Sequence, residues 1–195
     1  MTRVIAGTAG GRRLAVPPGG GTRPTSDRAR EGLFSTWSAL SGPLAGARVL
    51  DPYGGSGAVG LEALSRGAAH ALLAESDPRA ARTIRANIRA LGLPGADLRP
   101  VRAEQLAAGP PPGDPYDLVF LDPPYAVTDA DLRALLLALR ANGWLAPGAL
   151  ATVERSTRGG AFGWPDGFEE LRSRRYGEGT LWYGRTTGPD AGGRV

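Results

Sequence analysis

The sequence predicts an α/β fold in which seven strands form a mostly parallel, doubly wound sheet. Short apolar runs alternate with helical patterns between residues 47 and 154, and this alternation is typical of parallel strands covered by helices. A glycine-rich stretch follows the first of these runs, at the end of the strand where such folds bind ligands. The last two strand-like runs are joined by only Tyr176-Gly-Glu-Gly179. That connection is too short for a helix, so we expect these two strands to pair antiparallel.

The first 26 residues are expected to form a small basic extension. Residues 3–6 and 13–16 are strand-like runs around glycine-rich turn signals, which predicts a β-hairpin. Residues 17–24, PPGGGTRP, have the composition of a loop. Ser26 can cap a helix over residues 27–40. The apolar residues of that helix share one face at helical spacing, and they are Leu33, Phe34, Trp37 and Leu40.

The remaining elements follow from periodicity and from turn residues. The expected strands span 48–51, 70–75, 97–102, 116–122, 149–154, 169–175 and 180–185. The expected helices span 57–66, 78–91 and 129–142; the second has proline in its first turn, where proline is favoured. These elements define three expected parts: the extension at 1–26, an α/β domain at 27–185, and a disordered tail at 186–195.

Composition excludes several classes of site. The chain has no cysteine and a single histidine, His70, so disulfides, thiol nucleophiles and cysteine-based metal sites are excluded, and we expect no metal. No apolar run approaches the roughly 20 residues of a membrane span, and the N-terminus lacks the apolar core of a signal peptide. We therefore expect a soluble, cytoplasmic protein that does not bind membranes. Because no exposed apolar stripe requires a partner, we expect a monomer.

The positive charge is concentrated at the N-terminus. Residues 1–30 contain six arginines and one acid, a net charge of +5, whereas the remaining 17 arginines and 18 acids give −1. A cluster of this kind suits a polyanionic partner such as a nucleic acid. The alternative is a basic end that is simply solvated.

The stretch 51–60, DPYGGSGAVG, ends a strand and opens a helix. Its glycines let the backbone approach a ligand closely, and the helix N-terminus offers unpaired N–H groups. Residues 55–60 match the dinucleotide pattern G-x-G-x-x-G. Glu75 ends the next strand, where its carboxylate could accept hydrogen bonds from ribose hydroxyls. These features fit NAD and S-adenosylmethionine equally well.

Asp51 favours one of these two cofactors. A carboxylate immediately before the glycine loop would repel a pyrophosphate, but it can pair with the ammonium or sulfonium group of S-adenosylmethionine. The position of Asp51 therefore favours the methyl donor over NAD.

The segment LDPPY, 121–125, follows the expected strand at 116–122. Prolines cannot continue a sheet ladder, so the strand must stop here in a rigid backbone. Asp122 and the Pro123 carbonyl could accept the two hydrogens of a planar exocyclic amine, and Tyr125 could stack on its base. Positioning would then provide the catalysis without a strong base. We expect this strand to neighbour the one at 48–51, which would place LDPPY at the same crevice as the glycine loop.

Several motifs of the sequence, DPPY among them, together resemble those of a known family. DPPY is similar to the signature of amino-methyltransferases that act on adenine, guanine or glutamine amide nitrogens. The wider pattern consists of RVIAGTAGGRRL, RPTSDRAREGLF (23–34), LDPYGGSGAVGLEALSRGA (50–68) and LDPPY. This pattern resembles the RsmD family, which methylates guanine N2 in small-subunit ribosomal RNA, and the resemblance extends to about residue 185.

The resemblance implies a Rossmann-like class I methyltransferase fold that uses S-adenosylmethionine, with 16S rRNA of an assembling 30S subunit as partner. The implied catalytic residues are Asp122, Pro123, Pro124 and Tyr125. With the glycine loop, the candidate cofactor contacts are Asp51, Tyr53, Gly54, Gly55, Ser56, Gly57, Glu75, Ser76, Ala103 and Glu104, the last two in a turn after the third strand. The candidate substrate contacts are Arg12, Arg23, Thr25, Asp27, Arg28 and Glu31.

Other functions stay open on the residues alone. DPPY also permits DNA adenine N6 or a protein glutamine as acceptor, although the chain has little room for a DNA-recognition region. An inactive RNA-binding assembly factor with the same fold is a further alternative. A nicotinamide dehydrogenase is disfavoured because nothing in the chain resembles its acid–base pair.

Overall fold

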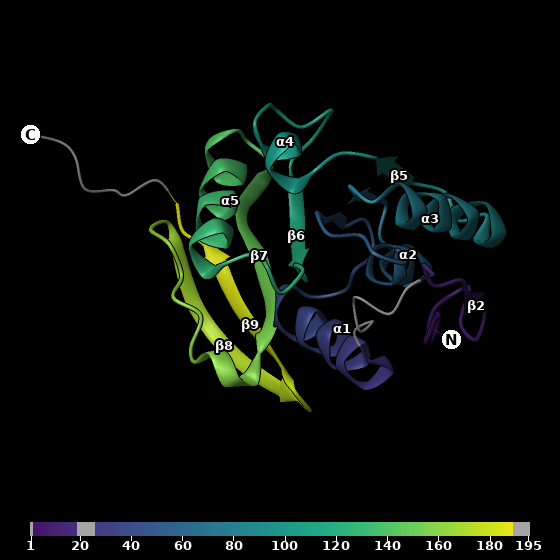
Figure 1. Cartoon of the computed structure of the whole chain (residues 1–195), viewed down its shortest axis with the longest axis horizontal. Coiled ribbons are helices and arrows are strands. Elements are labelled where there is room, and N and C mark those ends of the chain that lie inside the picture. The colour runs from purple at the N-terminus through teal and green to yellow at the C-terminus, as the bar shows by residue number, and fades with distance from the viewer. Residues whose placement is uncertain (1, 19–25, 189–195) are drawn as a thin grey trace, which may run out of the picture. The chain divides into compact units, whose positions relative to one another are not determined.

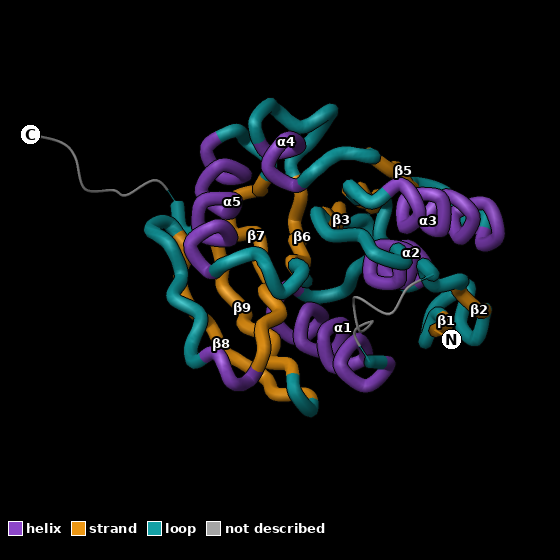
Figure 2. Tube along the Cα trace, in the orientation of Figure 1, coloured by secondary structure: helices purple, strands orange, loops and turns teal. Residues whose placement is uncertain are grey.

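The structure is a computed structural model, and it describes residues 2–18 and 26–188 (Figure 1). The chain divides into two compact units, Met1–Leu106 and Ala107–Val195. Figure 2 shows that strands and helices alternate along most of the chain.

The first unit begins with the expected hairpin. Strand β1 (Thr2–Arg3) pairs antiparallel with β2 (Arg13–Leu14), and both strands are shorter than the sequence predicted. Helix α1 (Asp27–Ser41) follows, and the Ser26 side chain accepts a hydrogen bond from the Ala29 amide, as expected of its cap. Its buried face includes Leu33, Phe34 and Trp37, as predicted, whereas the fourth residue of the predicted stripe, Leu40, is only half-buried.

Three parallel strands form the sheet of the first unit. Their order is β5 (Ala96–Arg99), β4 (His70–Ala74) and β3 (Arg48–Asp51). Helix α2 (Ala58–Ser65) packs on β3 and β4, and α3 (Pro78–Leu91) packs on β5 (Figure 1). The carboxyl ends of β3 and β4 therefore lie side by side, and each is followed by a candidate cofactor residue.

The second unit contains the other four strands, in the order β6 (Tyr116–Leu121), β7 (Leu145–Ser156), β9 (Gly179–Thr186) and β8 (Phe168–Tyr176). Strand β7 is parallel to β6, and β9 is antiparallel to both β7 and β8. The chain thus has a mostly parallel set of seven strands with an antiparallel C-terminal strand, as predicted. Helix α5 (Asp129–Ala141) lies between β6 and β7 in sequence and buries four leucines.

Two local predictions were wrong. Residues 102–104 were expected to form a turn, but Ala103 begins the short helix α4 (Ala103–Ala107), and β5 ends at Arg99 because Pro100 cannot extend the ladder. Strand β7 begins at Leu145 rather than at residue 149. A register shift in the β6–β7 pair accommodates Pro147-Gly148, because Tyr116 pairs with Leu145 but Leu118 pairs with Leu150.

Candidate active site

The glycine loop between β3 and α2 is held against the end of β4. The Gly54 amide donates to the Ala74 carbonyl at 2.8 Å, and the Gly57 amide donates to the Gly54 carbonyl at 2.6 Å. Gly55 and Gly57 have φ angles of +56° and +81°, a region that favours glycine. A Cβ atom on Gly54 would lie 2.9 Å from Ile84 Cδ1. The close packing and the left-handed backbone together explain why this loop is rich in glycine.

Glu75 joins the glycine loop to the start of α3. Its Oε2 accepts from the Gly55 amide at 2.9 Å, and its Oε1 accepts from the Asp77 amide at 2.8 Å. The side chain is half-buried, and the adjacent Ser76 is exposed. The structure thus brings together Glu75 and the glycine loop, two features that the sequence placed in one cofactor site. A carboxylate fixed at this position is suited to accept hydrogen bonds from the hydroxyl groups of a ligand.

Asp51 is buried at the end of β3, with 3% of its surface exposed. Burial raises the pKa of its carboxyl group to about 7, opposed by hydrogen bonds from the backbone of Tyr53 and Gly60 and assisted by the charge of Glu75. Its Oδ1 atom has no hydrogen-bond partner among the described residues. A buried acceptor without a partner is costly, and a cationic ligand group would satisfy it. The residues of the loop therefore fit a cofactor that carries an ammonium or sulfonium group.

Asn87 on α3 connects the glycine loop to the N-terminal extension. Its side-chain amide donates to the Ser56 carbonyl at 2.8 Å and the Ala15 carbonyl at 2.9 Å, and its Oδ1 accepts from the Ala15 amide at 2.9 Å. Only 3% of its surface is exposed. Asn87 was not among the residues predicted from the sequence, although an asparagine on the otherwise apolar buried face of an amphipathic helix is a detectable signal.

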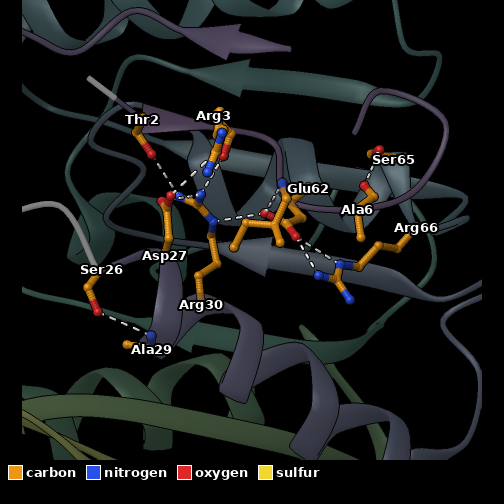
Figure 3. Close-up of polar contacts among 11 residues, drawn as sticks. Thr2, Arg3, Ala6, Ser26, Asp27, Ala29, Arg30, Glu62, Ser65 and Arg66 are labelled. Atoms are coloured by element: carbon orange, nitrogen blue, oxygen red, sulfur yellow. Dashed lines mark hydrogen bonds and ion pairs between the residues drawn. The ribbon is translucent and has the colours of Figure 1, made fainter. Parts of the chain in front are cut away.

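A second polar network fastens the extension and α1 to α2 (Figure 3). The Arg30 guanidinium donates to Glu62 Oε2 at 2.8 Å, to Thr2 Oγ1 at 3.1 Å and to the Arg3 carbonyl, and it pairs with Asp27 at 3.0 Å. Both Arg30 and Glu62 are fully buried.

The other carboxylate oxygen of Glu62 pairs with Arg66 at 2.6 Å, and the Arg66 guanidinium lies 4.6 Å from the centre of the Phe34 ring. The sequence analysis counted Arg30 among the N-terminal charges suited to a polyanion. That count was too high by one, because the charge of Arg30 is neutralised inside the protein.

The candidate substrate residues have different surroundings. Asp27 pairs with Arg30 and lies 3.8 Å from Arg3, so it contributes to the network of Figure 3. Arg28 and Glu31 are exposed on the first turns of α1. Arg12 is exposed and donates to the Leu91 carbonyl at 2.8 Å and to the Ala90 carbonyl. Two further candidates, Arg23 and Thr25, lie outside the described residues.

Strand β6 ends at Leu121, so the sheet stops before the two prolines as predicted, and the segment that follows is partly exposed. Asp122 and Pro123 are half-buried, and Pro124 is exposed. The Val127 amide donates to the Pro124 carbonyl at 3.0 Å, which closes a turn before α5. Tyr125 is 84% exposed, so its ring is not part of the core. An acid on a stiff backbone beside an exposed ring can hold a flat, polar group.

Ala103 and Glu104 occupy the first turn of α4. Ala103 is buried, and Glu104 is exposed and lies 3.5 Å from the Arg102 guanidinium. Within residues 2–18 and 26–188, no three His, Cys, Asp or Glu side chains gather so that they could hold a metal ion. In the same described part of the chain, no helix is both long and apolar enough to cross a membrane.

Comparison with known proteins identifies the relatives of the chain. It is 40% identical over 158 residues to ribosomal RNA small subunit methyltransferase D of Escherichia coli K12, covering 81% of this chain and 76% of that protein. The solved structure of the Escherichia coli protein yhhF superimposes with a TM-score of 0.82 at 34% identity, covering 95% of this chain and 97% of that one. The structure of the Thermus protein TTHA0928 superimposes with a TM-score of 0.74 at 34% identity, covering 94% of this chain and 98% of that one.

The family model described as Conserved hypothetical protein 95 matches residues 2–185, which include the glycine loop, Glu75, Asn87 and the segment after β6. The extent of this match agrees with the resemblance that the sequence motifs indicated. The chain therefore belongs to that family, the RsmD family.

Proposed function

We propose that this protein transfers a methyl group from S-adenosylmethionine to the exocyclic N2 of a guanine in the RNA of the small ribosomal subunit. The observation that carries the proposal is the segment Asp122–Tyr125, in which a carboxylate on a rigid Pro-Pro backbone precedes a tyrosine that is 84% exposed. The name of the Escherichia coli relative supports an RNA substrate of the small subunit. The family resemblance and the chemistry of the segment support an amino group as acceptor.

The first unit supplies the residues that would hold the cofactor. Asp51 offers a buried carboxylate oxygen without a partner, which suits a positive charge. Glu75 presents a fixed carboxylate beside the loop amides, which suits ribose hydroxyls. S-adenosylmethionine, when bound, supplies a methyl group activated by a sulfonium. NAD fits less well, because a pyrophosphate beside Asp51 would meet a like charge as that group ionises.

The second unit supplies the residues that would orient the acceptor. The Asp122 carboxylate and the Pro123 carbonyl accept the two hydrogens of the guanine amine, which directs the nitrogen lone pair away from the protein backbone. Tyr125 stacks on the base, which must leave its own stack to be reached. No strong base is required, because the chain contributes position and orientation while the proton leaves to water.

We propose that the substrate is RNA in a small subunit that is being assembled in the cytoplasm, and that the protein acts as a monomer. Arg28 follows Asp27 in the chain, and its exposed guanidinium could contact an RNA phosphate. Arg23 and Thr25 are further candidate contacts, and their contribution follows from the family resemblance alone.

The test uses small subunits from cells that lack this protein. The purified protein and labelled S-adenosylmethionine are added, the RNA is digested, and the labelled nucleoside is identified. Label in N2-methylguanosine at one position is the expected result. Label in another nucleoside would overturn the acceptor, and label only in duplex DNA or in protein would favour the alternative amine acceptors. Cofactor binding by calorimetry without transfer to any of these substrates would favour an inactive assembly factor.

A further inference from the structure

The exposed face of α3 carries four arginines and no acid. They are Arg79, Arg82, Arg85 and Arg89, and all four are exposed. The helix as a whole, PRAARTIRANIRAL, contains no aspartate or glutamate. The function proposed above does not use these residues, and a surface helix that is only solvated would ordinarily mix charges of both signs.

The four arginines form a continuous stripe. Their spacing of three and four residues places them within about 120° of arc, and the stripe is about 15 Å long. The opposite face of the helix is buried against the sheet, and its buried residues are Ala80, Ala81, Ile84, Asn87 and Leu91. Because the buried face fixes the rotation of α3, the arginines point to solvent together.

No acid neutralises this stripe by direct pairing. Within the described residues, none of the four arginines forms an ion pair. The acid that caps the helix is Asp77, whose pKa is held below its usual value by the backbone amides of Ala80 and Arg79, with a further contribution from the charges of Arg79 and Arg82. Asp77 is committed to the helix N-terminus, so the charge of the stripe is available to a partner.

Arg12 extends the stripe at the C-terminal end of α3. Its guanidinium donates to the carbonyls of Leu91 and Ala90, where the helix dipole favours a cation. Arg12 itself is exposed. These bonds fix the guanidinium in place before any partner arrives, which lowers the entropy that a partner must remove on binding.

The chemistry of the stripe selects among anionic partners. Guanidinium groups bind phosphates in two-point geometry, and a nucleic-acid strand carries regularly spaced phosphates. A basic helix that binds a membrane surface also needs large apolar side chains to insert. Among the described residues, the exposed large apolar side chains are Val16, Tyr125 and Leu137, and none lies on α3.

We propose that the arginine face of α3, together with Arg12, is a docking surface for the phosphate backbone of the substrate RNA, separate from the residues that hold the target base. This inference rests on the proposed function, because it assigns the partner of that activity. Backbone contacts position an RNA without reading its sequence, so the surface contributes affinity and orientation.

The test replaces three arginines in the middle and at the end of the stripe: Arg82→Gln, Arg85→Gln and Arg89→Gln in one variant. Glutamine has nearly the helix propensity of arginine, so α3 should be retained. Binding of small-subunit RNA is measured against salt concentration by filter binding. We expect an affinity at least about tenfold lower and a salt slope smaller by about 2, with unchanged affinity for S-adenosylmethionine.

Two matched variants control for net charge and for folding. A second triple variant removes the same charge from exposed positions of β8, through Arg172→Gln, Arg174→Gln and Arg175→Gln. This variant should keep nearly the RNA affinity of the parent protein. A third variant keeps the charge of the stripe, through Arg82→Lys, Arg85→Lys and Arg89→Lys, and it should retain most of the RNA binding. Thermal unfolding of each variant verifies that the fold is intact.

Three results would overturn the proposal. The glutamine variant of α3 could bind RNA with unchanged affinity and salt slope, or the β8 variant could lose as much affinity as the α3 variant. The third is that the α3 variant loses binding to vesicles of anionic lipid while it keeps binding to RNA. The methylation assay tests the reaction independently of the docking surface. If the parent protein transfers no label but its RNA binding depends on the arginines of α3, the proposed reaction fails and the docking surface stands.

Discussion

Arg30 on α1 and Glu62 on α2 form an ion pair in which both side chains are fully buried, with 2.8 Å between Nε and Oε2. A pair of this kind is weak evidence of net stability, because burial removes both charges from water. The pair instead contributes by fixing one arrangement of the segments that it joins. Arg30 also donates to the Arg3 carbonyl, and the same Oε2 of Glu62 also accepts from the Ile5 amide, so the pair holds the extension, α1 and α2 together.

Breaking this pair should destabilise the protein strongly. Glu62→Gln leaves the Arg30 guanidinium buried without its main counter-charge, and we expect the free energy of unfolding to fall by about 3 kcal/mol. Urea denaturation measures the loss. Arg99→Gln is the matched control, because it breaks a partly exposed pair with Asp97 and should change stability by less than about 1 kcal/mol. Equal urea midpoints for the parent and Glu62→Gln proteins would contradict this account.

Asn87 should affect cofactor binding, although it is a positioning residue that needs no contact with the ligand. Asn87→Leu keeps the branched shape of the side chain and removes the hydrogen bonds to Ser56 and Ala15. Because Ser56 lies in the glycine loop, we expect the affinity for S-adenosylmethionine to fall about tenfold, which is about 1.4 kcal/mol. Calorimetry measures this change. Thr83→Ala, on the same helix, should leave the affinity unchanged.

A different result would assign Asn87 another role. If Asn87→Leu lowers thermal stability but leaves the cofactor affinity unchanged, the residue only fastens the extension to α3. A loss of affinity that exceeds the loss of stability supports the positioning of the loop.

The sequence predicted the elements that local signals define. Helix α3 was predicted with its observed bounds from its periodicity and its first-turn proline, Pro78, and the structure adds a side-chain cap at Asp77 and a left-handed C-cap at Gly92. Helix α4 was missed because five residues without a cap carry too little periodicity. The pair of Arg30 and Glu62 joins residues 32 positions apart, and no local pattern specifies such a partner.

The ionisation of Asp51 should make both stability and cofactor affinity depend on pH. Burial raises the pKa of this carboxyl group from 3.8 to about 7 in the folded protein. Between these values the folded state binds a proton that the unfolded state has released, so the contribution of Asp51 to the free energy of unfolding decreases as pH rises from about 4 to 7. Asp51→Asn should remove this contribution, which differential scanning calorimetry at several pH values can measure.

Cofactor binding should show the opposite slope. A cationic ligand favours the ionised form of Asp51, so affinity for S-adenosylmethionine should increase with pH and level off above about 7. Titrations in two buffers of different ionisation enthalpy would detect the released proton. Asp51→Asn should bind more weakly and without this pH dependence. A parent protein with constant affinity between pH 5 and 8 would show that Asp51 does not meet the cationic part of the cofactor.

Asp122 should determine turnover with little effect on cofactor binding. Asp122→Ala removes an acceptor for the amine, and we expect a fall in kcat of about 100-fold or more from lost orientation, with the cofactor Kd kept within about twofold. Asp122→Asn keeps a carbonyl acceptor at the same place and should retain more activity than the alanine variant. Single-turnover methylation and calorimetry separate the two effects. Full activity in Asp122→Ala would remove this residue from the mechanism.

Tyr125 should contribute through its ring alone. Its side chain is 84% exposed, so Tyr125→Ala should not change the thermal stability. Stacking of one base on an aromatic side chain is worth about 1–3 kcal/mol, and we therefore expect the alanine variant to lose between about 5- and 100-fold in kcat/KM for the RNA. Tyr125→Phe keeps the ring and should retain nearly the parent value. If kcat/KM falls as much in the phenylalanine variant as in the alanine variant, the hydroxyl group rather than the ring is the functional part. Tyr125 would then act by hydrogen bonding to the base or to the RNA backbone.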